Sequence, residues 1–301
     1  MPADAVSEQW ASGEGWRLLA ASVRGTAHLR AGSDCQDAAL VRLVVSGQGD
    51  PAVLLAASDG AGSAEHSQEG SALVCRAVLR ELERLSADPG FDPAALDAAA
   101  LLSGLRTELE QYAEERGYHL RELACTLLAG LVLPRAAWWV QVGDGAIVFE
   151  DAAGLHLHVW PDNGEYANQT YFVTDAPAKH LHAALCTGEI RRAALLTDGL
   201  QDLALSSASR APHAPFFDPV FRALEQAGEG WAATLPEGLR QFLDSAAVNA
   251  RTSDDKTLVL ACRTLDAFKV EPEDDLLLIE VAHDQVAQDE AAQTNMTQEG
   301  A

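Results

Sequence analysis

The sequence predicts an α+β fold in which antiparallel sheets are layered and the helices lie outside them. Three observations support this class. Strand-like patterns occupy both ends of the chain, two long helical patterns follow each other with no strand between them, and a meander of strands comes next. Because strands and helices do not alternate one by one, a doubly wound parallel sheet is disfavoured.

The first third of the chain combines strands, a loop and two helices. Strands are predicted at residues 16–23, 39–45 and 52–57. A polar loop is predicted at 25–37. Apolar residues at helical spacing predict a helix over 63–85, and a second helix over 93–116 begins at Asp92-Pro93 and ends before Gly117.

The remainder of the chain is predicted to return to strands before further helices and a closing strand. The meander consists of strands at 125–133, 136–142, 146–150 and 155–160. A polar segment without clear period occupies 161–182. A strand is then predicted at 192–196, helices at 214–224 and 231–248, and a last strand of the ordered sheet at 257–262.

One domain is predicted over residues 16–263. A short N-terminal segment, 1–15, precedes it, and an acidic tail, 264–301, follows it. The tail contains a pattern for an edge strand at 276–281, after which its composition predicts disorder.

Composition restricts the class of protein. The chain has 301 residues, 48% of them hydrophobic, and a formal charge of -24, which argues against nucleic acid or an anionic membrane as the main partner. The start has no signal pattern and the longest apolar run, 123–133, is too short to cross a bilayer, so we expect a cytoplasmic protein. The five cysteines form no C-x-x-C pair, which favours free thiols over disulfides or zinc ligands.

Four short acidic motifs adjoin the apolar runs. They are Ser58-Asp59-Gly60, Gly143-Asp144-Gly145, Thr197-Asp198-Gly199 and Ser253-Asp254-Asp255. Aspartate is rare inside strands, so each is either a turn residue or a ligand at a rigid edge. Glycine beside the aspartate in three of them lets backbone approach an ion, and four such motifs together favour hard oxygen ligands for Mg²⁺ or Mn²⁺. Since strand ends in one sheet can converge, the motifs predict a single metal site.

These motifs, in their order and approximate spacing, resemble the metal-dependent protein phosphatases of the PP2C type over residues 16–263. The resemblance rests on Gly25-Thr26-Ala27-His28, Cys35-Gln36-Asp37-Ala38, Ser58-Asp59-Gly60-Ala61-Gly62, Ala124-Cys125-Thr126-Leu127-Leu128, Val142-Gly143-Asp144-Gly145, Leu196-Thr197-Asp198-Gly199-Leu200 and Ser253-Asp254-Asp255-Lys256-Thr257. The insertion at 161–170 further resembles the bacterial stand-alone branch of that family.

The resemblance implies a fold and a set of ligands. The fold would be a central β-sandwich of two antiparallel sheets flanked by helices on both faces, in α-β-β-α layers, with the metals at one end. Asp59 would bridge two ions, and the carbonyl of Gly60 would join the second. Asp198 and Asp254 would complete the first, and Asp144 would help to hold a third.

The implied activity is hydrolysis of phosphoserine and phosphothreonine in proteins by a hydroxide held between two or three Mg²⁺ or Mn²⁺ ions. Phosphomonoesters hydrolyse extremely slowly without catalysis, and two ions about 3.5 to 4 Å apart can activate a water and stabilise the charge of an in-line displacement. The expected partners are a phosphorylated protein substrate and a serine/threonine kinase or its targets. No protein nucleophile is needed, and Cys125 lacks the C-x5-R loop of cysteine phosphatases.

Several positions depart from the family pattern. Gln36 replaces the usual glutamate, so a ligand of the second ion becomes a neutral amide. Gly32 occupies the place of the phosphate-binding arginine, for which Arg30 or His28 either compensates or is an ordinary loop residue. His66 either replaces the family's leaving-group acid or is an early residue of a helix.

Substrate contacts leave two interpretations open. Asn163, Glu165 and Asn168 either form a flap that recognises substrate beside the metals or belong to a structural loop. Asp37 is a further candidate for contact with the phosphate or the substrate. Two alternatives to the protein phosphatase are a catalytically weak, phosphatase-like binding or regulatory module and a small-molecule phosphatase on the same scaffold.

Overall fold

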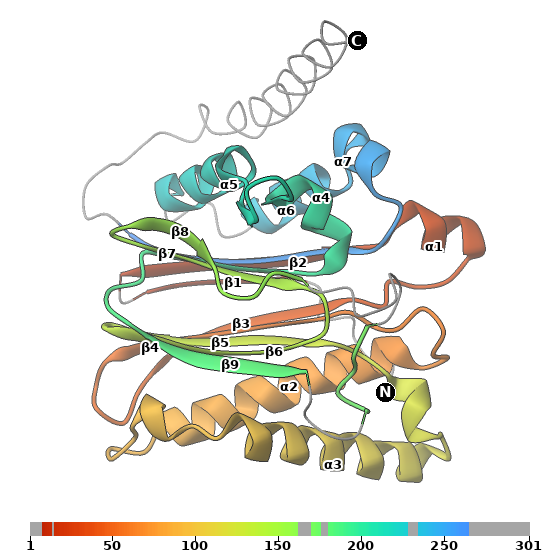
Figure 1. Cartoon of the computed structure of the whole chain (residues 1–301), viewed down its shortest axis with the longest axis horizontal. Coiled ribbons are helices and arrows are strands. Elements are labelled where there is room, and N and C mark those ends of the chain that lie inside the picture. The colour runs from red at the N-terminus through yellow and green to blue at the C-terminus, as the bar shows by residue number, and fades with distance from the viewer. Residues whose placement is uncertain (1–7, 14, 162–169, 176–179, 228–233, 265–301) are drawn as a thin grey trace, which may run out of the picture.

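A computed structural model describes residues 8–13, 15–161, 170–175, 180–227 and 234–264, which form a β-sandwich between two layers of helices (Figure 1). The strands are β1 (Glu8–Gly13), β2 (Trp16–Val23), β3 (Ala38–Val45), β4 (Pro51–Ser58), β5 (Leu127–Leu133), β6 (Ala136–Val142), β7 (Ala146–Asp151), β8 (Gly154–Leu157), β9 (Leu181–Thr187), β10 (Arg192–Leu196), β11 (Leu205–Ser206), β12 (Ala211–Pro212) and β13 (Lys256–Arg263). The predicted fold class, α+β with α-β-β-α layers, is confirmed.

Two antiparallel sheets face each other. In the described residues one sheet has the order β1-β2-β13-β10-β7-β8 and the other has the order β3-β4-β5-β6-β9, while β11 and β12 form a separate pair. The last strand, β13, lies between β2 and β10 in the middle of its sheet. The second strand, β2, and the last strand, β13, are therefore neighbours in space.

Helices cover the outer face of each sheet. The described helices are α1 (Thr26–Ala31), α2 (Ser67–Ser86), α3 (Ala98–Arg116), α4 (Gln201–Ala204), α5 (Ala214–Gln226), α6 (Leu235–Leu243) and α7 (Ala246–Arg251), with 3₁₀ turns η1 (Pro93–Ala95), η2 (Leu120–Leu123) and η3 (Asp198–Leu200). Figure 1 shows α2 and α3 under the sheet that contains β4, and α4, α5 and α6 over the sheet that contains β2.

The core has three layers because successive side chains of a strand point to opposite faces. On β4, Leu54 packs with α2, whereas Leu55 packs between the two sheets with Phe149. On β6, Trp138 lies in the helix-facing cluster and Trp139 in the cluster between the sheets. Both faces of the central strands are therefore buried.

The predicted helices are partly wrong in their bounds. The loop predicted at 25–37 contains α1, which ends at Gly32 in the left-handed region with φ 73°. The helix predicted over 93–116 is divided into η1 and α3, because the Asp97 carboxylate accepts hydrogen bonds from the backbone N–H groups of Ala99 and Ala100 and starts a new helix there. The segment predicted at 231–248 contains α6 and α7, of which the second is capped by Ser245; residues 228–233 lie outside the described part.

The predicted meander is also wrong in one respect. Strand β6 pairs with β9, whereas β7 leaves that sheet and pairs with β10 in the other. The chain crosses between sheets at Gly143-Asp144-Gly145, where Gly143 has a φ of 103° that favours glycine. Strands β1 and β9 are not among the predicted elements, and the edge strand predicted at 276–281 lies outside the described residues.

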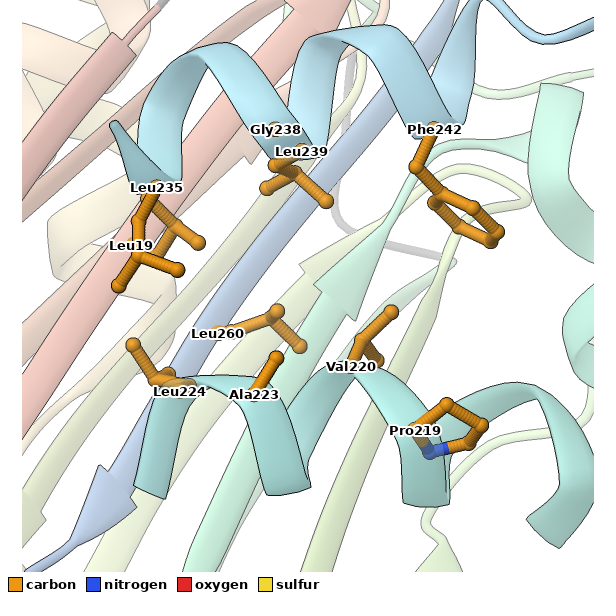
Figure 2. A pocket seen from close by; sticks show the side chains of 10 residues that line it. All are labelled: Leu19, Pro219, Val220, Ala223, Leu224, Leu235, Gly238, Leu239, Phe242 and Leu260. Atoms are coloured by element: carbon orange, nitrogen blue, oxygen red, sulfur yellow. The ribbon is translucent and has the colours of Figure 1, made fainter. Parts of the chain in front are cut away.

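One helix-covered face of the sandwich contains a small cavity. A small apolar cavity of about 20 Å³ lies between α5, α6 and the sheet, lined by side chains that include Val220, Leu239 and Leu260 (Figure 2). It is about the size of one water molecule and is too small for an organic ligand.

All five cysteines are free thiols, as predicted. None of the described helices is long and apolar enough to cross a bilayer.

Candidate metal centre

The acidic motifs lie at one edge of the sandwich. Strand β4 ends at Ser58, directly before Asp59, and β10 ends at Leu196, directly before Thr197 and Asp198. Strand β13 begins just after Asp254-Asp255, and its first residue pairs with the last residue of β2. Antiparallel pairing aligns these ends, so motifs far apart in the sequence converge.

The turn at Asp59 is fixed by the segment that precedes β5. The N–H of Asp59 donates to Thr126 Oγ1 at 2.9 Å, and the N–H of Thr126 donates to the Asp59 carbonyl at 2.8 Å. The Ser58 hydroxyl donates to the Thr126 carbonyl at 2.6 Å. A Cβ on Gly60 would lie 2.7 Å from the Gln36 carbonyl oxygen, so only glycine lets the two segments come so close.

Three further carboxyl groups surround the Asp59 side chain at this turn. Burial, followed by the charges of Asp37, Asp198 and Asp254, raises the pKa of Asp59 well above its ordinary value. Burial and Asp255 raise the pKa of Asp37 to about 8. Burial, Asp144 and Asp254 raise the pKa of Asp198 to about 6. Such mutual repulsion in a cluster of buried acids is what a bound cation relieves.

Buried oxygens without partners face the same region. Among the described residues, Asp37 Oδ1, Asp198 Oδ1 and Gln36 Oε1 are buried and accept no hydrogen bond. Buried acceptors are normally paired, so these atoms are suited to a hard divalent cation. However, no three Asp, Glu, His or Cys side chains within the described segments already close around one point. The residues fit a metal centre, and the assignment of individual ligands remains a prediction.

Asp144 lies on the Asp198 side of the cluster. It is buried, its Oδ2 accepts a hydrogen bond from Thr170 Oγ1 at 2.5 Å, and its carbonyl accepts one from the Gln201 side chain. Thr170 is the last residue of the insertion that was predicted to form a flap or a structural loop. Residues 162–169, which include Asn163, Glu165 and Asn168, lie outside the described part of the chain.

Asp254 is the most open of the predicted ligands. Its side chain is exposed, and its Oδ1 accepts the N–H of Asp255 at 2.9 Å. The backbone of Asp254 lies against Gly25, where a Cβ would be only 2.3 Å from the Asp254 carbonyl carbon. The segment before α1 and the segment before β13 are therefore in close contact.

His28 and Arg30, the two candidates for phosphate contact, differ in position. Nδ1 of His28 is 2.8 Å from Asp255 Oδ1, and the His28 side chain is 21% exposed. The guanidinium of exposed Arg30 donates to the carbonyl and the hydroxyl of Thr26, one turn earlier in α1. Of the two, His28 is the one directed at the acidic motifs.

His66 is engaged elsewhere. Its ring stacks on Tyr118 with centroids 3.6 Å apart, and its Nδ1 is 3.4 Å from Glu69 Oε1. Glu69 also accepts the hydroxyl of Tyr112, so these groups tie the start of α2 to α3. This network occupies the imidazole in helix packing, which leaves it poorly suited to replace the leaving-group acid.

Several residues that support the centre are absent from the sequence predictions. Thr197 Oγ1 donates to Asp37 Oδ2 at 2.8 Å and accepts the N–H of Thr257 at 3.1 Å. Lys256 is fully buried, and its ammonium donates to Asn249 Oδ1 at 2.5 Å. Asp255 is 3% exposed. For Asp255 and Lys256 the sequence signal was the run Asp254-Asp255-Lys256, three charged residues at the start of an otherwise apolar strand.

Comparison with known proteins identifies relatives that match most of this chain. Serine/threonine-protein phosphatase 3 of Escherichia coli (strain K12) is 37% identical over 247 residues, which cover 82% of this chain and 98% of that protein. The serine/threonine phosphatase of S. agalactiae has the same fold, with a TM-score of 0.54 and 14% identity over 82% of this chain and 99% of that one.

A second solved structure shares the fold. The catalytic domain of serine threonine protein phosphatase PstP, in complex with two manganese ions, has a TM-score of 0.50 and 17% identity over 83% of this chain and 99% of that one. At the level of sequence, the profile described as protein phosphatase 2C matches residues 24–244. The chain therefore belongs to the protein phosphatase 2C family.

Proposed function

We propose that this metal-dependent protein phosphatase hydrolyses phosphoserine and phosphothreonine in proteins, with Asp59, Asp198 and Asp254 as essential ligands of Mg²⁺ or Mn²⁺. The observation that carries the proposal is the group of mutually repelling carboxyls at one edge of the sandwich, with buried acceptors that lack partners. The 37% identity to a serine/threonine-protein phosphatase supports the choice of substrate class.

The roles of the residues follow from their positions. When bound, two divalent ions supply a nucleophilic water and neutralise charge on the phosphoryl oxygens. Asp59 would serve both ions, with the Gly60 carbonyl and Gln36 on one side and Asp198 and Asp254 on the other. The Thr126 hydrogen bonds described above hold the Asp59 turn in place, which limits the reorganisation needed when substrate binds.

A third ion is proposed at Asp144, whose charge is the largest acidic influence on Asp198. Asp37 is assigned a supporting role at the edge of the site, because Thr197 already donates to one of its oxygens while the other is buried without a partner. The flap role of Asn163, Glu165 and Asn168 stays a prediction for residues outside the described segments.

His28 is proposed as the phosphate contact in place of the missing arginine. Because its Nδ1 faces Asp255, Nε2 is the nitrogen that remains for a phosphate oxygen, and it donates there when the imidazole is protonated. We expect His28→Ala to raise the KM for a phosphothreonine peptide about tenfold, the cost of about one charge-assisted hydrogen bond. Arg30→Ala, the matched control on the same helix, is expected to leave KM unchanged. The reverse pattern in steady-state kinetics would assign the contact to Arg30.

The setting proposed for the enzyme is the cytoplasm, where five free thiols are stable and kinase products are available. Its partners would be phosphorylated proteins that a serine/threonine kinase produces, or the kinase itself. The excess of negative charge on the chain is consistent with proteins rather than nucleic acids as substrates.

The test is a phosphatase assay on the purified protein. We expect release of phosphate from phosphoserine and phosphothreonine peptides with Mn²⁺ or Mg²⁺, and none after treatment with EDTA. Nucleotides and sugar phosphates serve as competing substrates, and faster turnover of one of these would identify a small-molecule phosphatase. Tight Mn²⁺ binding without turnover of any of these compounds would instead identify a binding module.

A further inference from the structure

Asp255 is a buried carboxylate that does not belong to the predicted ligand set. It follows Asp254 and precedes β13, and only 3% of its surface is exposed. Lys256, the next residue, points its buried ammonium at Asn249 rather than at Asp255. The carboxylate must therefore find its partners elsewhere, since an unpaired buried charge is strongly unfavourable.

Its partners all come from the segment between β2 and β3. Oδ1 accepts the N–H of Gly25 at 2.6 Å and is 2.8 Å from His28 Nδ1, while Oδ2 accepts the N–H of Gln36 at 2.6 Å. Both carboxylate oxygens are thus engaged by donors of the protein. A single side chain holds the start, the middle and the end of this segment.

The held segment leads directly into the metal centre. The side-chain Oε1 of Gln36 is buried without a partner. The backbone carbonyl oxygen and the Cβ of Gln36 lie against Gly60, at 2.7 and 3.0 Å from where a Gly60 Cβ would be. Asp37, the next residue, is a neighbour of Asp59. Fixing the backbone N–H of Gln36 therefore fixes two side chains on that side of the centre.

We propose that Asp255 is a positioning residue, which binds no ion but holds Gln36 and Asp37 against Asp59 and Gly60 and so sets the affinity for the second ion. The inference rests on the proposed function. A carboxylate suits this place because each of its oxygens accepts a backbone N–H, from Gly25 and from Gln36, while its negative charge lies beside the His28 imidazole. An asparagine there would direct its own NH₂ group at one of these donors. Positioning matters more for Gln36 than for a carboxylate ligand. A neutral amide attracts an ion less strongly, so its contribution to binding depends more on being held in the right place.

The test compares Asp255→Asn with Asp88→Asn. Asp88 is a suitable control because its Oδ1 accepts the N–H of Gly90 at 2.7 Å in an exposed turn between α2 and η1, so the same kind of bond is lost away from the centre. In EDTA-treated protein, we expect Asp255→Asn to speed amide hydrogen exchange of residues 25–37 about tenfold while β4 and β5 keep their protection. The control should leave residues 25–37 unchanged.

The second readout is Mn²⁺ binding by calorimetry. We expect the weaker of the Mn²⁺ sites to lose about tenfold to a hundredfold in affinity in Asp255→Asn, as is usual when a residue behind a ligand is changed. The kcat for p-nitrophenyl phosphate should recover when Mn²⁺ is raised to saturation. A loss confined to kcat, with Mn²⁺ affinity unchanged, would overturn the proposal. Exchange that accelerates equally over the whole domain would also overturn it, because the role would then be general stability.

A milder variant covers the case in which Asp255→Asn does not fold. His28→Ala removes one of the three partners and is expected to speed exchange of residues 25–37 by a smaller factor than a complete release. No change in this segment would contradict the positioning role. If the parent protein bound no Mn²⁺ and hydrolysed no phosphoester, the proposed function would fail, whereas the exchange experiment would still report on the contacts of Asp255.

Discussion

Replacing Asp59 by Asn is expected to lower kcat for p-nitrophenyl phosphate with Mn²⁺ by at least about a thousandfold, because it removes the carboxylate at the centre of the acidic group. The same variant should be more stable than the parent in EDTA. Burial and the charges of Asp37, Asp198 and Asp254 disfavour the ionised form of Asp59, and the amide removes that repulsion. Loss of activity with a gain in melting temperature is a combination that misfolding cannot produce.

Asp50→Asn is the matched control for this experiment. Asp50 is exposed in the turn between β3 and β4, at the opposite end of β4 from Asp59. The control should keep the parent's kcat and melting temperature within error. If Asp59→Asn hydrolysed p-nitrophenyl phosphate at the parent rate, the assignment of this edge as the metal centre would be wrong.

Removing divalent metal is expected to make stability fall as the pH rises. The pKa of Asp37 is raised to about 8 and that of Asp198 to about 6, both above the value near 3.8 expected in the unfolded chain. Between about pH 4 and pH 8 the folded protein therefore holds protons that the unfolded chain has released. Raising the pH through this window removes those protons from the folded state, so the metal-free protein becomes less stable.

Mn²⁺ should reverse this trend, since it binds the deprotonated carboxylates. Ligand at a hundred times its Kd stabilises the folded state by about 2.7 kcal/mol, and the gain in melting temperature should be larger at pH 8 than at pH 6. Differential scanning calorimetry at both pH values, with EDTA or Mn²⁺, checks this. A metal-free melting temperature that rises steadily from pH 5 to pH 8 would contradict the raised pKa values.

Much of the fold was predictable because its strands are buried on one or both faces. Strand β2 has the predicted bounds, and β4 and β13 differ from them by one residue at each end, since apolar runs such as 52–57 leave no other place for a strand. The convergence of the acidic motifs was also predictable. Antiparallel strand ends meet at an edge, and the Asp-Gly turns mark that edge in the sequence.

The features that were predicted wrongly or missed depend on contacts between distant parts of the chain, which the residue pattern along the sequence does not show. The exchange of β7 into the other sheet depends on the turn at Gly143, whose conformation has no distinct signal among Asp-Gly turns. Strand β9 pairs along an open edge, so most of its side chains are half-buried or exposed and show no apolar run. The role of Asp255 depends on amides more than two hundred positions away in the chain, which only the folded arrangement reveals.

The position of β13 in the middle of its sheet limits how far the protein can fold while it is being synthesised. Strand β2 precedes β13 by more than two hundred residues in the chain, yet it pairs with β13 (Lys256–Arg263) in the sheet. During translation, β2 and β10 are both made before β13, so neither can pair with the strand that lies between them in the sheet. Asp254, which directly precedes that strand, is also still missing. We therefore expect the nascent protein to be inactive until nearly the whole domain has been synthesised, because a fragment that stops short of β13 lacks a strand in the middle of one sheet.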